Sequence, residues 1–213
     1  MTADINSAKD FLLDIFFPNR CPVCDRFIMW NLSVCEDCES RLSKYRCESD
    51  DIISAYRYAG SVLDGIYSLK FAGGRNFAKH CAKIIAPALA GDFDCIVPVP
   101  TGKKRRRKRG YNQAEIFAEY LSQITTIPVK KNILKRVIET EQHLLSETER
   151  KANAENSYKA DKNSGQAAGK RIILADDVLT TGATVTACTK LLYAAGAESV
   201  ITAVCAKTQK NQS

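Results

Sequence analysis

The chain lacks any apolar run long enough to cross a membrane. Its N-terminal apolar stretch, residues 11–17, ends at Pro18, whereas a membrane helix needs roughly 20 residues. A basic leader followed by an apolar stretch is also missing, so we expect no secretory signal. Internal repeats are absent. We therefore expect a cytoplasmic protein without membrane insertion, whose 213 residues, 45% of them hydrophobic, suffice for one ordinary domain and a small appendage.

Outside one segment, the chain has no excess of positive charge. It contains 31 lysines and arginines against 24 acidic residues, and residues 103–109 are an uninterrupted basic run. Without this run, basic and acidic residues are equal in number. The positive charge is therefore local, which predicts a site for a polyanion rather than a generally basic surface.

Cysteine, in contrast, is abundant, with nine in the chain. Two Cys-x-x-Cys pairs are formed by Cys21, Cys24, Cys35 and Cys38. Their spacing lets four thiolates converge on one Zn²⁺, and a closed four-sulfur site stabilises a segment too short to build its own core. We predict a structural zinc site. The alternatives are four unrelated thiols or a redox pair.

The other cysteines do not have the spacing of metal ligands. Cys81, Cys95, Cys188 and Cys205 lie in apolar stretches, so we expect them to be small core residues. Cys47 lies near the expected domain boundary, and its role stays open. We expect a zinc-binding module over residues 1–50 and a second domain over residues 51–213.

The second domain alternates short apolar strands with helical segments, which indicates an α/β fold around an open, mostly parallel sheet. Strands are expected at residues 52–58, 95–99, 133–137, 171–175 and 199–205. Helices are expected at residues 8–17, 36–44, 62–71, 77–89, 113–124, 147–153 and 183–195. Residues 27–30 are a candidate hairpin arm, and residues 161–169 a surface loop. His80 is expected on the surface of its helix.

The most informative segment follows the strand expected at residues 171–175. Two adjacent acids come directly after this strand, so they should lie at the carboxyl edge of the sheet, where ligands bind in open α/β folds. Threonines and a glycine then begin a helix whose N–H groups and hydroxyls can surround a phosphate. The predicted set is Asp176, Asp177, Val178, Leu179, Thr180, Thr181, Gly182, Ala183 and Thr184.

Carboxylates suit the hydroxyls of a ribose, and a phosphate cradle beside them suits its 5-phosphate. The segment therefore predicts a site for a phosphorylated ribose. The alternative is a strand–turn–helix whose Asp and Thr residues merely cap the helix.

These motifs together resemble known proteins. Four apolar residues, two acids and a Thr/Gly-rich loop are similar to the fingerprint of type I phosphoribosyltransferases. With the four-cysteine module added, nearly the whole chain resembles the ComF family, also called ComF/GntX. The further matching segments are Val97-Pro98-Val99-Pro100, Arg109-Gly110-Tyr111-Asn112-Gln113-Ala114, Thr140-Glu141-Gln142, Leu145-Ser146 and Arg150-x-x-Asn153.

The resemblance implies a fold and a ligand. The fold is a type I phosphoribosyltransferase-like sheet, and the ligand is phosphoribosyl diphosphate with Mg²⁺ to neutralise its diphosphate. A pyrophosphate loop is implied at Pro100, Thr101, Gly102 and Lys103, and a mobile loop at residues 140–146. Asp176 and Asp177 are the implied catalytic residues of a pentosyl-transferring phosphoribosyltransferase.

Whether the chain catalyses transfer stays open. His143 is either a general base or a solvated loop histidine. The related glutamine amidotransferases carry an N-terminal nucleophilic cysteine, whereas this chain begins Met1-Thr2, so we expect no glutamine amidotransfer.

The basic run lies beside the implied diphosphate loop. Such a run attracts nucleic-acid phosphates through counterion release, and an adjacent aromatic ring can stack an unpaired base. The predicted residues for single-stranded DNA are Lys103, Lys104, Arg105, Arg106, Arg107, Lys108, Arg109 and Tyr111. The alternative is a solvated, mobile loop that serves only small phosphates.

The ComF resemblance implies a protein of DNA uptake in natural transformation. It would bind phosphoribosyl diphosphate and single-stranded DNA, with a DNA-uptake helicase and a strand-loading protein as partners. The alternatives are a salvage phosphoribosyltransferase for an unidentified base and a non-catalytic sensor of phosphoribosyl diphosphate. The zinc module favours the first, because salvage enzymes rarely need one for chemistry.

Overall fold

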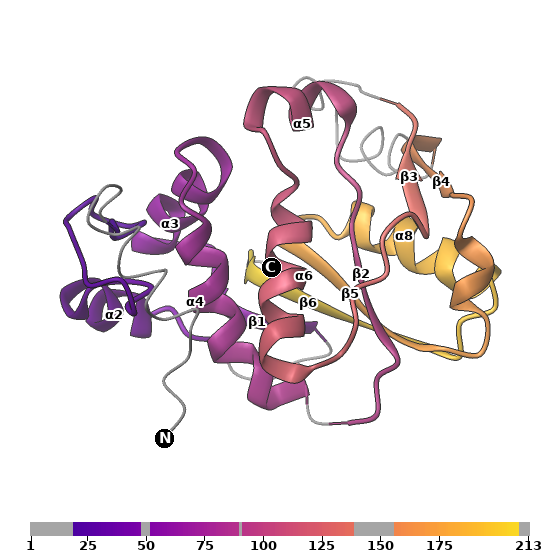
Figure 1. The fold of residues 1–213 in the computed structure, drawn as a ribbon, viewed down its shortest axis with the longest axis horizontal. Coiled ribbons are helices and arrows are strands. Elements are labelled where there is room, and N and C mark those ends of the chain that lie inside the picture. The colour runs from indigo at the N-terminus through magenta and orange to yellow at the C-terminus, as the bar shows by residue number, and fades with distance from the viewer. Residues whose placement is uncertain (1–18, 48–51, 90, 139–155, 209–213) are drawn as a thin grey trace, which may run out of the picture.

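The computed structural model describes residues 19–47, 52–89, 91–138 and 156–208. Within them, the centre is a four-stranded sheet with the order β1-β6-β5-β2, in which every pairing is parallel (Figure 1). Its strands are β1 (Ile52–Arg57), β2 (Cys95–Pro98), β5 (Arg171–Leu179) and β6 (Ser199–Lys207). The predicted α/β fold around a parallel sheet is confirmed.

The helices lie close to their predicted positions. They are α2 (Glu36–Ser43), α3 (Ser61–Phe71), α4 (Arg75–Ile85), α6 (Gln113–Thr125) and α8 (Ala183–Ala194), together with α5 (Lys103–Arg109), where no helix was expected. Short 3₁₀ turns follow at η1 (Ala86–Leu89) and η3 (Ser164–Ala167). Pro87 lacks the N–H that would continue α4, so the helix expected at residues 77–89 ends earlier. The helices expected at residues 8–17 and 147–153 lie outside the described residues, as do His143 and residues 140–146.

Side chains of the sheet alternate between two dry faces. On β5, Ile173 and Ala175 pack with α3, α4 and α6, whereas Ile172 and Leu174 pack with α8. Figure 1 shows these helices on opposite sides of the sheet. Burial on both faces explains why the strands read as nearly continuous apolar runs.

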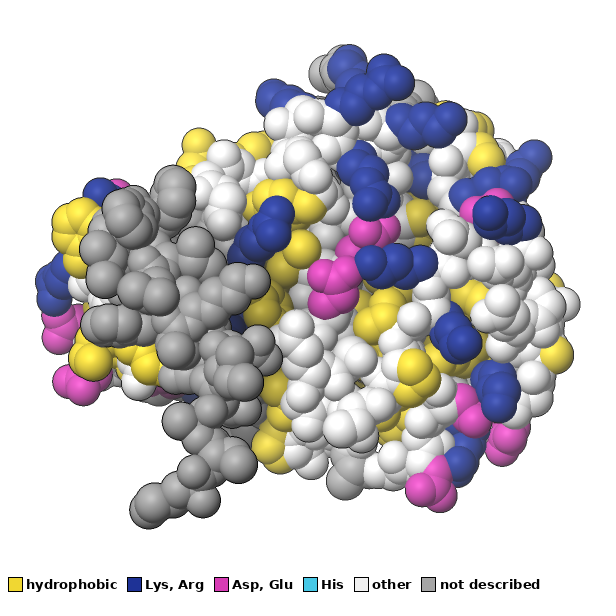
Figure 2. All heavy atoms as spheres, in the orientation of Figure 1, with side chains coloured by type: hydrophobic (Ala, Val, Ile, Leu, Met, Phe, Trp, Pro, Cys, Tyr) yellow, Lys and Arg dark blue, Asp and Glu magenta, His cyan; other side chains and the backbone are white. Residues whose placement is uncertain are grey.

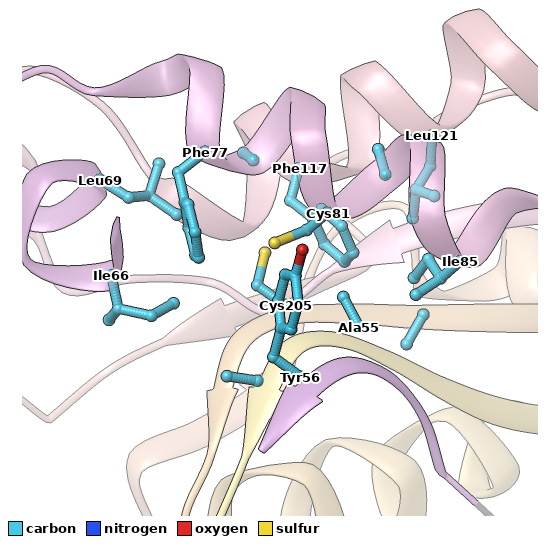
Figure 3. Close-up of a cluster of buried hydrophobic side chains, with 14 of the residues drawn as sticks. Ala55, Tyr56, Ile66, Leu69, Phe77, Cys81, Ile85, Phe117, Leu121 and Cys205 are labelled. Carbon is cyan, nitrogen blue, oxygen red and sulfur yellow. The ribbon is translucent and has the colours of Figure 1, made fainter. Parts of the chain in front are cut away.

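The core between α3, α4 and α6 is built around aromatic rings and sulfur. Figure 3 shows Phe77 and Phe117 with Tyr56, Cys81 and Cys205 between the helices and the sheet. A Cβ on Gly65 of α3 would overlap the ring of Phe77, so the close approach of α3 and α4 requires glycine. Cys95 and Cys188 are buried in the opposite core, which confirms the expected core role of these four cysteines.

The strand expected at residues 133–137 does not join the parallel sheet. It forms β3 (Leu134–Arg136), which pairs antiparallel with β4 (Tyr158–Ala160) in a separate two-stranded ladder. Leu134 is buried and Lys135 is exposed, so only one face of this strand is buried. A strand inside the parallel sheet is buried on both faces. A parallel bridge from Val129 to Ile96 lies beside β2 instead.

Two further local expectations are partly met. Of the candidate hairpin arm at residues 27–30, Phe27 forms an isolated antiparallel bridge with Arg20. The surface loop expected at residues 161–169 contains η3, which buries Ala167.

None of the helices in the described part of the chain has both the length and the apolar character needed to pass through a bilayer.

The expectation that His80 lies on a helix surface is wrong. Its side chain is buried, with Nε2 at 2.7 Å from the hydroxyl of Tyr56 and 3.1 Å from Oε2 of Glu39. Arg46 binds the other oxygen of Glu39 at 2.9 Å, and its guanidinium lies over the Tyr56 ring. The cysteine-rich module packs on this side of α4, and the periodicity of α4 alone cannot reveal a partner so distant in sequence.

We predict that His80 stays neutral in the folded protein. Burial, only partly offset by Glu39, lowers its pKa to about 4 from the usual 6.5. Between these values the unfolded chain binds the proton more readily, so stability should fall as the pH drops through this window, by roughly 2–3 kcal/mol. The pH dependence of urea unfolding should be shallower in His80→Gln. In NMR spectra, a His80 ring that titrates near pH 6.5 in the folded protein would contradict this.

Candidate functional site

A cleft of about 210 Å³ opens where β2 and β5 end. In Figure 2, acidic side chains lie in the middle of this face, with lysine and arginine side chains gathered around them. The cleft is lined by Lys70, Val99, Pro100, Thr101, Arg105, Arg109, Asn112, Gln113, Ala114, Arg136, Tyr158, Asp176, Asp177, Val178, Thr180 and Thr184. Segments that are far apart in the sequence therefore meet at one edge of the sheet.

The acidic pair lies inside β5 rather than after it. The strand was expected to end at residue 175, but its pairing with β6 continues to Leu179. Oδ2 of Asp177 forms an ion pair with Nζ of Lys70 at 3.2 Å, and both side chains are largely buried. Burial, followed by the charge of Asp177, raises the pKa of Asp176. A cation or hydrogen-bond donors arriving at Asp176 would therefore stabilise its charged form.

Four cations surround this pair. Arg105 and Arg109 lie one turn apart on α5, Arg136 belongs to β3, and Lys70 to α3. Burial, and then the charges of Arg136 and Arg109, lower the pKa of Arg105. Because the crowded like charges repel one another, an anion in the cleft would relieve an unfavourable arrangement.

The turn before α8 and the first turn of this helix form one wall of the cleft. Thr180 and Thr184 line it, whereas Leu179, Thr181, Gly182 and Ala183 of the predicted set do not. Gly182 adopts φ 80°, and a Cβ there would meet nothing within 4 Å. Glycine is thus required by the backbone conformation and leaves open space beside the helix N-terminus.

Tyr158 of β4 is also part of the cleft lining. Its hydroxyl accepts a hydrogen bond from Nη1 of Arg136 at 3.3 Å. Burial raises the pKa of Tyr158 to about 12, against the opposing effects of Arg136 and a hydrogen bond with Thr184. The phenol therefore stays protonated near neutral pH and can donate to an oxygen ligand.

The motif at residues 109–114 builds the junction between α5 and α6. Asn112 caps α6 by accepting from the N–H of Ala114 at 3.2 Å, and its Nδ2 donates to the carbonyl of Val99 at 2.9 Å. Gln113 is 3% exposed and accepts from Arg109 at 3.1 Å. Among the described residues, its buried Nε2 has no partner. An unsatisfied buried donor is unfavourable, so this atom fits a ligand rich in acceptors.

The basic run is helix α5, not a loop, and it divides into two sets. Arg105 and Arg109 face the cleft, and Arg106 binds both carboxylate oxygens of Glu115 at 2.8 and 3.1 Å. The residues that are exposed and do not line the cleft are Lys103, Lys104, Arg107 and Lys108, together with the paired Arg106. Of the implied pyrophosphate loop, Pro100 and Thr101 line the cleft, whereas Gly102 and Lys103 do not.

Tyr111 is held in place rather than freely exposed. Its hydroxyl donates to the carbonyl of Leu69 at 2.6 Å, which ties the end of α3 to the segment after α5. The guanidinium of Arg75 lies over the ring at 5.0 Å. A base stacked on Tyr111 would therefore have to displace Arg75.

The four cysteines of the N-terminal module converge. Their Sγ atoms all lie within 4.8 Å of one another, and those of Cys24 and Cys35 are 3.7 Å apart. Tetrahedral zinc with bonds of about 2.3 Å requires sulfurs about 3.8 Å apart, so the cluster fits this ion. Arg41 donates to Sγ of Cys38 at 2.7 Å and would offset part of the thiolate charge.

Comparison with known proteins identifies both parts. A family model described as phosphoribosyl transferase domain matches residues 72–213, and one described as double zinc ribbon domain matches residues 12–49. Competence protein ComFC of Bacillus subtilis is 30% identical over 173 residues, which cover 77% of this chain and 67% of that protein. The chain belongs to the ComF family.

Other relatives of this ComF-family chain extend the similarity. Competence protein F of Haemophilus influenzae is 38% identical over 108 residues, which cover 50% of this chain. The matched region spans 47% of the length of that relative. DNA utilization protein YhgH of Escherichia coli is 28% identical over 199 residues, which cover 84% of this chain and 86% of that protein. The zinc-ribbon match and the converging thiols together support one structural zinc ion in the ComF-family module.

Several residues of the ComF-family cleft were not predicted as site residues. Lys70, Arg136 and Tyr158 come from segments without a recognisable motif, and no local signal marks them. Asn112 and Gln113 lie in the motif at residues 109–114, so a signal existed for these two. Their roles, a helix cap and an unpaired amide, depend on where the chain places them.

We predict that the zinc site is required for stability. Cys38→Ser should lose the metal, whereas Cys47→Ser, outside the cluster, should retain about one zinc per chain. If the lost metal removes about 3 kcal/mol, the Tm should fall by roughly 6–12 °C. Plasma mass spectrometry and thermal unfolding measure the two effects. Wild-type protein purified without zinc, in the absence of chelator, would contradict the prediction.

Proposed function

We propose that this ComF-family protein acts in DNA uptake, binding phosphoribosyl diphosphate with Mg²⁺ in the cleft and single-stranded DNA along α5. The observation that carries the proposal is the pair of carboxylates in the second half of β5, just beyond the end of β2, enclosed by four cations. The matched phosphoribosyl transferase domain supports the small ligand. The relatives named as competence and DNA utilization proteins support the setting.

The chemistry of the cleft complements each part of this ligand. Asp176 and Asp177 accept hydrogen bonds from ribose hydroxyls. The 5-phosphate lies at the N-terminus of α8, where Thr180 and Thr184 donate hydroxyls and the helix dipole favours an anion. The diphosphate lies toward α5, where Arg105 and Arg109 face the cleft and the unpaired amide of Gln113 gains an acceptor.

The carboxylates of the cleft also fit a magnesium ion. Mg²⁺ is usually held by one or two carboxylates together with substrate phosphates, and Asp176 and Asp177 are the carboxylates available. When bound, the ion would neutralise charge on the diphosphate. Lys70 already balances Asp177, so Asp176 gains most from an added cation, and its raised pKa would fall.

Transfer of the phosphoribosyl group requires an acceptor that loses a proton. Asp176 and Asp177 are the carboxylates that line the cleft, so one of them is the candidate to take that proton. Two measurements separate the functions: diphosphate release with an added base indicates a salvage-type transferase, whereas binding without release with any acceptor indicates a sensor or a DNA-uptake factor.

We expect Asp177→Asn to weaken binding of phosphoribosyl diphosphate at least tenfold, because hydrogen bonds to a charged carboxylate are worth about 1.5–3 kcal/mol. The matched control is Asp92→Asn, because the side chain of Asp92 is 90% exposed. This variant should bind phosphoribosyl diphosphate as wild type does. Isothermal titration calorimetry with Mg²⁺ measures both. No heat with the zinc-loaded wild type would overturn the proposed ligand.

The DNA part of the proposal is tested on the outer face of α5. Arg107→Gln/Lys108→Gln should reduce the salt slope of single-stranded DNA binding by about 1.4, because each lost phosphate contact contributes about 0.7. The control is Lys83→Gln/Lys170→Gln, which removes two exposed lysines outside the cleft lining, one in α4 and one just before β5. Equal salt slopes of DNA binding in the two variants would contradict the proposed site on α5. Binding of phosphoribosyl diphosphate should survive in both.

A further inference from the structure

Helix α3 presents an aromatic surface that its packing does not require. Its inner face is complete, since Val62, Ile66 and Leu69 are at most 1% exposed. On the outer face, Tyr67 and Phe71 are 63% and 55% exposed. Their ring centroids are 5.0 Å apart, with the planes inclined by 44°. Large exposed aromatic side chains that are grouped in this way commonly mark a binding surface.

This aromatic pair is joined to the basic helix. The guanidinium of Arg109 lies 5.0 Å from the centroid of the Phe71 ring. Tyr111 fixes the same junction, because its hydroxyl binds the carbonyl of Leu69 in the last turns of α3. These contacts place α5 and the rings of α3 next to each other beside the cleft.

We propose that Tyr67 and Phe71 stack unpaired bases of a DNA single strand whose phosphates follow the exposed face of α5. The inference rests on the proposed DNA binding and adds where the bases are held. Single-strand binding proteins combine a positive track for the backbone with aromatic rings for the bases. Both parts occur here on neighbouring helices.

The surface suits a nucleic acid better than an apolar protein partner. Arg109 lies over the Phe71 ring and the exposed bases of α5 belong to the same helix as Arg109, while Asp64, the acidic residue of α3, lies in its first turn at the other end of the helix. A single strand satisfies the positive charge and the ring faces together. Tyr111, the aromatic residue expected to stack a base, has Arg75 over its ring.

The test compares two ligands of equal charge. Fluorescence anisotropy measures binding of a labelled oligothymidylate of about 16 nucleotides and of an abasic strand of equal length. Tyr67→Ala and Phe71→Ala should weaken binding of the oligothymidylate at least about fivefold while leaving the abasic strand and the salt slope unchanged. Tyr67→Trp should restore stacking. The matched control is Tyr193→Ala on α8, 49% exposed and outside the cleft lining.

Photocrosslinking with 5-iododeoxyuridine locates the base directly, and adducts on Tyr67 or Phe71 are expected by mass spectrometry. The inference is overturned if the alanine variants bind oligothymidylate as wild type does, if they lose the abasic strand equally, or if adducts map to other helices. It is also overturned if the variants instead abolish self-association of the protein in size-exclusion chromatography. Failure of wild type to bind either strand would refute the proposed DNA function itself.

Discussion

Strand β5 is hydrogen-bonded on both sides, to β2 and to β6, and it carries two adjacent carboxylates to the edge of the sheet. Neighbouring like charges in a partly buried position are unfavourable without compensation. Lys70 provides part of this compensation through its ion pair with Asp177. Arginines from α5 and β3 add positive charge around the two carboxylates. The fold meets this requirement by bringing cations from α3, α5 and β3 to the same end of the sheet.

The zinc module contributes to this arrangement at a distance. The backbone of Tyr45 and Cys47 hydrogen-bonds to the outer edge of β1. Between them, Arg46 forms an isolated antiparallel β-bridge with Tyr56. The ring of Tyr45 occupies the space that a side chain on Gly60 would need, just before α3 begins. Glu39 and Arg46 contact His80 and Tyr56 beside it. The module therefore supports the start of the helix whose other end places Lys70 in the cleft.

Local patterns predicted much of this structure. The strands of the parallel sheet are apolar because both faces are dry, and the spacing of Cys21, Cys24, Cys35 and Cys38 reflects the geometry of one ion. The position of Asp176 and Asp177 at the sheet edge was likewise visible, because a strand, acids and a Thr/Gly-rich turn are contiguous in sequence.

Features that depend on distant partners were not predictable. Seven adjacent bases disfavour a helix through like-charge repulsion, yet α5 forms, with Arg106 paired to Glu115 and Gly110 ending the helix at φ 80°. His80 is polar, and its burial depends on two distant partners, Tyr56 of β1 and Glu39 of the zinc module. Lys70 and Arg136 acquire their roles solely from the cleft that the fold assembles.

The pairing of β1 with β6 has a practical consequence for dissecting this protein. A fragment starting at residue 72, where the phosphoribosyl transferase match begins, would retain the acids but lack β1. Strand β6 would then become an edge strand with exposed amide and carbonyl groups. Exposed edge strands pair with strands from other molecules. Expression of that fragment would favour aggregates, whereas the boundary expected near residue 50 keeps β1 and α3 with the sheet.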